Sequence, residues 1–237
     1  MAARLRATLS ARLAVLAVVA VALAYIEASV VVYLRQVIVP VREIHFPSAV
    51  REVLPLLSPE QLEQAGHEVA SLLVVEVIRE ITPIAVLLAV AWGLSRRKAE
   101  TTALFMIGFA LWDVFYYGFL KILLDWPASL TTWDVLYLIP TAWVAPVWAP
   151  LVVSVTLLLG GMAILHRSGR HQVAKGPLWA WLLVVLGVGL VLASFLLRTK
   201  EAFQAAPVQF DWPWFLAGWL SAVGGMVWLL RSGSSRA

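Results

Sequence analysis

The sequence contains no cysteine and few charged residues, and these two shortages exclude several classes of protein. Without a thiol, the chain has no disulfide, thiolate metal site, iron–sulfur cluster or cysteine nucleophile. Charged residues make up only 14% of the 237 residues, whereas hydrophobic residues make up 62%. This composition is far too apolar for an ordinary soluble domain and indicates an integral membrane protein.

Histidine is also scarce, and all four copies lie outside the long apolar runs. They are His45, His67, His166 and His171. No pair of them can ligate a haem between two spanning helices, so we expect no haem cofactor. The formal net charge is +4, but the basic residues flank hydrophobic segments, which is typical of topology determinants. We therefore expect a lipid bilayer as the surroundings and no nucleic-acid partner.

The apolar residues fall into six runs of roughly the 20 residues that a helix needs to cross a bilayer. They predict an all-α, polytopic membrane helix bundle that forms a single domain over residues 1–237. The predicted transmembrane helices cover about 12–34, 70–94, 101–121, 144–165, 177–197 and 213–230. The fifth and sixth of these spans could face lipid, a membrane protein partner or a second copy of the chain.

Basic residues are divided unevenly between the two sides of these spans. With a cytoplasmic N-terminus, 11 of the 18 Lys and Arg residues lie at inner boundaries, where Glu100 is the accompanying acid. The outer segments then hold 6 basic residues and 9 of the 14 acids. The positive-inside rule therefore predicts that both termini are cytoplasmic. The expected location is the cell (inner) membrane.

Two long outer connections are predicted, at 35–69 and 122–143. The first mixes apolar and charged residues, which suits a segment lying along the membrane surface. Within it, Ser58-Pro59-Glu60-Gln61 predicts a helix start, and that helix could continue into the second span. The second connection leads into a stretch up to residue 150 whose four prolines prevent one continuous helix. We expect it to form an interfacial or re-entrant outer cap, with Asp134 in the first turn of a short helix.

Five ionisable residues lie inside the predicted spans, where a charge costs at least roughly 2.5–3.5 kcal/mol. They are Glu27, Glu76, Arg79, Glu80 and Asp113. All belong to the first three helices, and a rise of 1.5 Å per residue places them at a similar depth in the outer half of the bilayer. On the second helix, the three charged residues fall within one sector, so a single neighbouring helix can meet them.

The charge count decides what kind of site these residues could form. One arginine cannot neutralise four carboxylates, so converging acids would need protons, a bound cation or an aqueous opening. We therefore predict a site that binds or relays a proton or cation for transport. Its expected members are Glu27, Glu76, Arg79, Glu80 and Asp113, with Tyr116, Tyr117 and Lys121 beside them.

Other functions stay open on the sequence alone, and so does the cofactor. A divalent metal could be held by oxygen ligands from Glu80, Asp113 and Glu27, supplemented by His67 if that side chain folds inward. The chain could instead be an accessory subunit in which the charges only fix helix packing. A third possibility is a membrane enzyme that uses the acids on a lipid-like substrate. No motif assigns catalytic residues.

Overall fold

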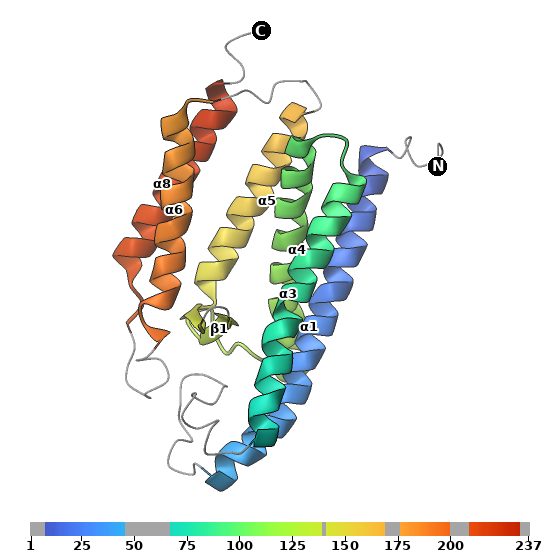
Figure 1. Cartoon of the computed structure of the whole chain (residues 1–237), viewed down its shortest axis with the longest axis vertical. Coiled ribbons are helices and arrows are strands. Elements are labelled where there is room, and N and C mark those ends of the chain that lie inside the picture. The colour runs from blue at the N-terminus through green and yellow to red at the C-terminus, as the bar shows by residue number, and fades with distance from the viewer. Residues whose placement is uncertain (1–7, 46–66, 139–140, 169–175, 200–208, 233–237) are drawn as a thin grey trace.

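The computed structural model describes residues 8–45, 67–138, 141–168, 176–199 and 209–232, and this part of the chain is mostly helical. Six helices run along a common direction (Figure 1). They are α1 (Leu9–His45), α3 (His67–Leu94), α4 (Lys98–Leu124), α5 (Trp148–Ser168), α6 (Leu178–Leu196) and α8 (Trp212–Ser232). α1 begins and α8 ends at the same end of the bundle, which we call the inner end.

Five of the described helices are long and apolar enough to cross a membrane. They are α1 as far as Gln36, α4, α5, α6 and α8. This supports a multi-pass helical membrane protein, in agreement with the sequence. The remaining predicted span, 70–94, falls on α3, and its crossing stays a prediction. The cytoplasmic position of the termini and the identity of the membrane also stay predictions.

The segment predicted to form an outer cap contains a short β hairpin, which the all-α prediction did not include. β1 (Trp133–Tyr137) and β2 (Trp143–Pro146) pair antiparallel, with Val135 opposite Val144. Prolines exclude a continuous helix here, and the aromatic and β-branched residues between them favour extended strands. Asp134 consequently lies on a strand rather than in a first helical turn. For the same reason α5 begins at Trp148, four residues later than predicted.

The helices form two groups. In the first group, α4 packs against α1, α3 and α5. The second group is the pair α6 and α8, which pack closely because glycines face the neighbouring backbone. A Cβ on Gly187 would lie 2.4 Å from the Ala222 backbone nitrogen, and one on Gly225 would lie 2.6 Å from the Ala180 carbonyl oxygen. The pair contacts the first group chiefly through α5 and β2.

Apolar clusters hold the bundle together at both ends. Towards the inner end, Leu16, Leu104 and Leu165 join α1, α4 and α5. Towards the outer end, Phe195 and Phe215 pack with the residues at the base of the β hairpin. The space between the two helix groups, beside the hairpin, is not filled by either cluster and contains the cavity described below.

A buried ion pair fixes the inner end of the first group. Arg12 Nη1 lies 3.0 Å from Glu100 Oε2, and each side chain is only 10% exposed. The same nitrogen donates to the carbonyl oxygen of Leu94 at 3.0 Å. Glu100 also accepts a hydrogen bond from the backbone N–H of Arg96 at 2.9 Å. The start of α1, the end of α3 and the start of α4 are thereby joined at one point.

Candidate binding cavity

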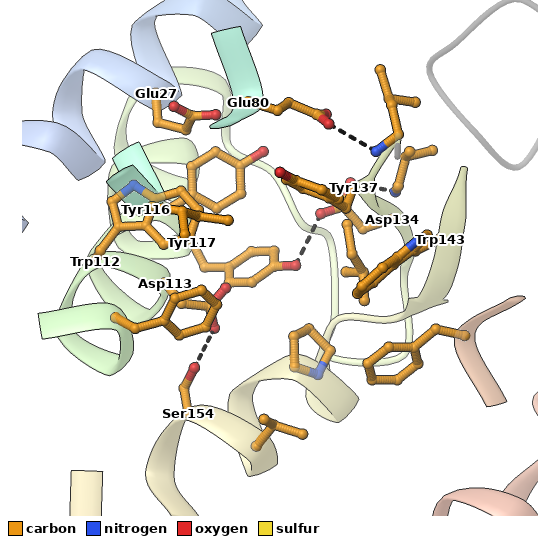
Figure 2. A pocket seen from close by; sticks show the side chains of 18 of the residues that line it. Glu27, Glu80, Trp112, Asp113, Tyr116, Tyr117, Asp134, Tyr137, Trp143 and Ser154 are labelled. Carbon is orange, nitrogen blue, oxygen red and sulfur yellow. Dashed lines mark hydrogen bonds between the residues drawn. The ribbon is translucent and has the colours of Figure 1, made fainter. Parts of the chain in front are cut away.

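A cavity of about 490 Å³ lies between the two helix groups, beside the β hairpin (Figure 2). All six described helices and both strands contribute to its lining. Its volume is in the range of small-molecule sites, which is about 300–1,000 Å³. The buried charges predicted from the sequence gather here, because Glu27, Glu76, Arg79, Glu80 and Asp113 all line this cavity.

Arg79 on α3 is the centre of an ion-pair network between α1 and α3. Its Nη1 lies 2.6 Å from Glu27 Oε2. Its Nε and Nη2 donate to the two carboxylate oxygens of Glu76 at 2.7 and 2.5 Å. This two-point contact within one helix follows from the spacing of three residues. Arg79 therefore compensates two of the acids, and its contact with Glu27 joins α3 to α1.

Glu80 lies one helical turn beyond Glu76, yet it has no ion-pair partner in the described part of the chain. The residue is only 9% exposed. Its Oε2 accepts a hydrogen bond from the backbone N–H of Leu138 at 2.8 Å, which connects α3 to the end of β1. A carboxylate that accepts one amide hydrogen bond retains unused acceptor capacity. Glu80 can therefore accept a further donor or cation from the cavity.

Asp113 is the corresponding acid on α4. Its Oδ2 accepts a hydrogen bond from the hydroxyl of Ser154 on α5 at 2.7 Å. Ser154 is buried, so this contact lies inside the first helix group. No cationic side chain among the described residues pairs with Asp113. Like Glu80, it reaches the cavity as an acid held by a neutral donor.

Asp134 on β1 is a cavity residue that the sequence interpretation missed. It is only 5% exposed, and its Oδ2 accepts a hydrogen bond from the Tyr117 hydroxyl at 2.9 Å. Its Oδ1 accepts the backbone N–H of Val135, also at 2.9 Å. Burial raises the pKa of Asp134 to about 7, although these two hydrogen bonds and the charge of Arg35 act in the opposite direction. A proton therefore binds to this carboxyl near neutral pH.

Arg35 is the second cation of the cavity, and it was predicted to belong to the outer connection 35–69. Because α1 continues beyond residue 34, Arg35 follows Glu27 and Val31 at intervals of four residues on one helix face. Its guanidinium carbon lies 5.0 Å from the centre of the Trp126 ring, which is a cation–π contact. Its Nε is buried and has no hydrogen-bond partner among the residues described.

One predicted member, Lys121, does not join the cavity, and another, His67, is not tested. Lys121 is 52% exposed, and its Nζ lies 2.7 Å from Asp125 Oδ1 at the outer end of α4. This hydrogen bond and charge lower the pKa of Asp125. The side chain of His67 lies outside the described part of the chain, as does the predicted helix start at 58–61. By contrast, Tyr116 and Tyr117 line the cavity as expected.

The predicted metal site is not assembled by the described residues. Among them, no three His, Asp or Glu side chains are close enough together to hold a metal ion. The predicted ligands have separate partners instead: Glu27 pairs with Arg79, Glu80 with the backbone of Leu138, and Asp113 with Ser154. The contribution expected of His67 is untested.

The cavity contains the predicted excess of acids over basic residues, but Asp134 and Arg35 also line it and Lys121 does not. Five acids and two arginines line the cavity: Glu27, Glu76, Glu80, Asp113, Asp134, Arg35 and Arg79. The chain is thus a helical, membrane-compatible protein of the multi-pass class with charged side chains around a cavity between its helices. Comparison with protein-family models, curated proteins and solved structures finds no match for the chain.

Proposed function

We propose that the protein is a membrane carrier whose cavity binds a cation and exchanges it for a proton on the buried acids. The observation that carries this proposal is the charge of the cavity, where five acids accompany two arginines. An excess of acids in apolar surroundings is unfavourable unless protons or a cation neutralise it. Protons and the cation then compete for the same carboxylates, which couples their movements.

The position of the cavity supports a transport role. Secondary transporters commonly bind their substrate between two groups of helices that rock against one another. Here α6 and α8 form a closely packed pair that contacts the first group chiefly through α5 and β2. The cavity lies at that boundary, so a relative movement of the two groups would change access to Glu80 and Asp113.

A second candidate function, an accessory subunit of a membrane complex, is favoured by one specific observation. Arg79 on α3 pairs with Glu27 on α1 and with Glu76 on its own helix, without any ligand. Such a network fixes the relative position of two helices by itself. On this alternative, the charges serve packing, and the exposed apolar side chains of α6 would contact a partner protein.

Proton-coupled flux in proteoliposomes tests the carrier proposal. Vesicles with an internal pH-sensitive dye and an acidic lumen receive Na⁺, K⁺ or trimethyl(4-phenylbutyl)ammonium on the outside. The organic cation has a fixed charge, so it cannot carry a proton itself. We expect at least one of the three to alkalinise the lumen faster than it does in protein-free vesicles.

Variants connect this flux to the cavity. Glu80→Gln and Asp113→Asn should lower the flux at least about tenfold, because each removes a carboxylate on which proton and cation compete. Asp125→Asn is the matched control, since it replaces an exposed acid outside the cavity. No flux with any of the three cations would contradict the carrier proposal. Unchanged flux in both cavity variants would also contradict it.

A further inference from the structure

We infer that the cavity takes an amphipathic organic cation, in which a protonated or quaternary amine is attached to an apolar body. This inference rests on the proposed function in treating the cavity as the substrate site, and it adds the chemical class of the ligand. Three features support it: the location of the uncompensated acids, the aromatic side chains around them, and the apolar surface opposite.

The negative charge is not compensated evenly around the cavity. Arg79 is occupied by Glu27 and Glu76. Glu80 and Asp113 each accept a single hydrogen bond from a neutral donor, at 2.8 and 2.7 Å. Glu80 and Asp113 therefore lack a counter-charge, and a ligand with a cationic group would supply it.

Asp134 extends the acidic side of the cavity onto the β hairpin. Its two hydrogen bonds also come from neutral donors, the Tyr117 hydroxyl and a backbone N–H. The three acids thus come from α3, α4 and β1 and approach one space from different directions (Figure 2). A cationic group placed there meets carboxylates on several sides, as a bound ammonium requires.

Aromatic side chains surround the acids. Trp112, Tyr116, Tyr137 and Trp143 line the cavity close to them (Figure 2). Aromatic faces attract organic cations, and recognition of quaternary ammonium groups by aromatic cages is a common use of this interaction. They also favour an organic cation over hydrated Na⁺ or K⁺, which would lose its water shell to a largely apolar wall.

The opposite side of the cavity is apolar. The side chains contributed by α6 and α8 include Val188, Leu192, Phe195 and Trp219, and no charged residue of these two helices lines the cavity. A ligand with charge at one end only would place its apolar body against α6 and α8 and its cationic group towards α3 and α4. The volume of about 490 Å³ leaves room for such a body beside the cationic group.

The inference is tested first on the unmodified protein with a series of three ligands. Binding to the purified chain in a neutral detergent is measured by isothermal titration calorimetry. Trimethyl(4-phenylbutyl)ammonium carries both charge and apolar body, tetramethylammonium carries the charge alone, and the carbon analogue with a tert-butyl head carries the shape without charge. We expect saturable binding of the first, and at least about tenfold weaker binding of the other two.

Variants then locate the binding. Glu80→Gln and Asp113→Asn should each weaken binding of the complete cation about tenfold, whereas Asp125→Asn should leave it unchanged. Size-exclusion chromatography and thermal unfolding show whether each variant is folded. If a variant does not fold, the ligand series on the unmodified chain still decides the question.

The outcomes separate the ligand class from the carrier function. Equal affinity for the cation and its uncharged analogue would overturn the inference, as would binding that neither cavity variant affects. Flux driven by Na⁺ or K⁺ without binding of the organic cation would also overturn it, while the carrier proposal would stand. Binding of the organic cation without flux for any ion would support the ligand class and contradict the carrier proposal.

Discussion

The contact between α6 and α8 leads to a prediction that can be tested with two neighbouring glycines. A Cβ on Gly187 would meet backbone atoms of α8, at 2.4 Å from the Ala222 nitrogen and 2.5 Å from the Gly218 oxygen. A Cβ on Gly189 of the same helix would meet nothing within 4 Å. Replacement by alanine should therefore have opposite effects at these two positions.

The magnitudes follow from this geometry. Ordinary van der Waals contact begins at about 3.4 Å, so Gly187→Ala requires the two helices to separate by about 1 Å. Backbone atoms cannot rotate away, and overpacking of this kind costs about 1–3 kcal/mol. The higher helix propensity of alanine returns about 0.5–1 kcal/mol, and at Gly189 this gain is the only effect. We expect a net loss of about 1–2 kcal/mol for Gly187→Ala and a small gain for Gly189→Ala.

Thermal unfolding in detergent measures both changes. For a chain of this size, 1 kcal/mol corresponds to about 2–4 °C in Tm. Gly187→Ala should therefore lower Tm by about 2–8 °C, and Gly189→Ala should leave it unchanged or raise it slightly. Trp179 on α6 packs against Trp228 on α8, with 4.9 Å between the ring centroids, so tryptophan fluorescence reports on the separation of the two helices. Equal Tm values for the two variants would refute the close contact at Gly187.

Two further predictions concern buried charges elsewhere. Glu100→Gln leaves the Arg12 guanidinium buried without its counter-charge, so it should cost about 3 kcal/mol in chemical unfolding; a loss below 1 kcal/mol would contradict the burial of this pair. The pKa of Asp134 is raised by burial to about 7, so the folded state binds a proton more tightly than the unfolded state. The resulting stability is complete below about pH 4 and is lost as the pH rises through 7. The groups that face this carboxyl are Arg35, Asp113, Tyr116 and Tyr117, and all of them are retained in Asp134→Asn. Between pH 5 and 8, the Tm of this variant should fall less than the Tm of the unmodified chain. Parallel Tm profiles would refute the assignment.

The sequence was sufficient to predict that the charged residues of the first three helices lie close together. Helical rise and phase are nearly constant, so the depth of Glu27 and Asp113 and the shared face of Glu76 and Arg79 follow from counting residues. The structure agrees, since all of them line one cavity. Counting residues cannot predict which charged groups pair with one another. Arg79 forms ion pairs with Glu27 and Glu76, while Glu80 accepts a hydrogen bond from the backbone N–H of Leu138.

The missed residues depend on features that helical counting does not contain. Asp134 reaches the cavity because a proline-containing hairpin folds back against the helices, which is a tertiary event. A local signal existed in the aromatic and β-branched residues around it, which favour a strand. Arg35 could have been found by extending the stripe of Glu27 and Val31 by one more turn of α1. Lys121 shares a stripe with Asp113 and Tyr117, but in the last turn of α4 it is free to pair with Asp125.

The ion pair of Arg12 with Glu100 has a geometric consequence for the far end of α1. Arg12 also donates to the carbonyl oxygen of Leu94 at the end of α3, so the start of α1 is fixed by polar contacts to both neighbouring helices. Glu27 lies 15 residues further along, or about 22 Å at 1.5 Å per residue, and Arg35 lies about 35 Å away. A tilt of α1 by about 5° about Arg12 therefore displaces Glu27 by about 2 Å and Arg35 by about 3 Å. If the tilt carries α1 away from α3, it breaks the 2.6 Å contact between Glu27 and Arg79. A rotation that is barely detectable at the inner end thus removes the counter-charge of Glu27 in the cavity.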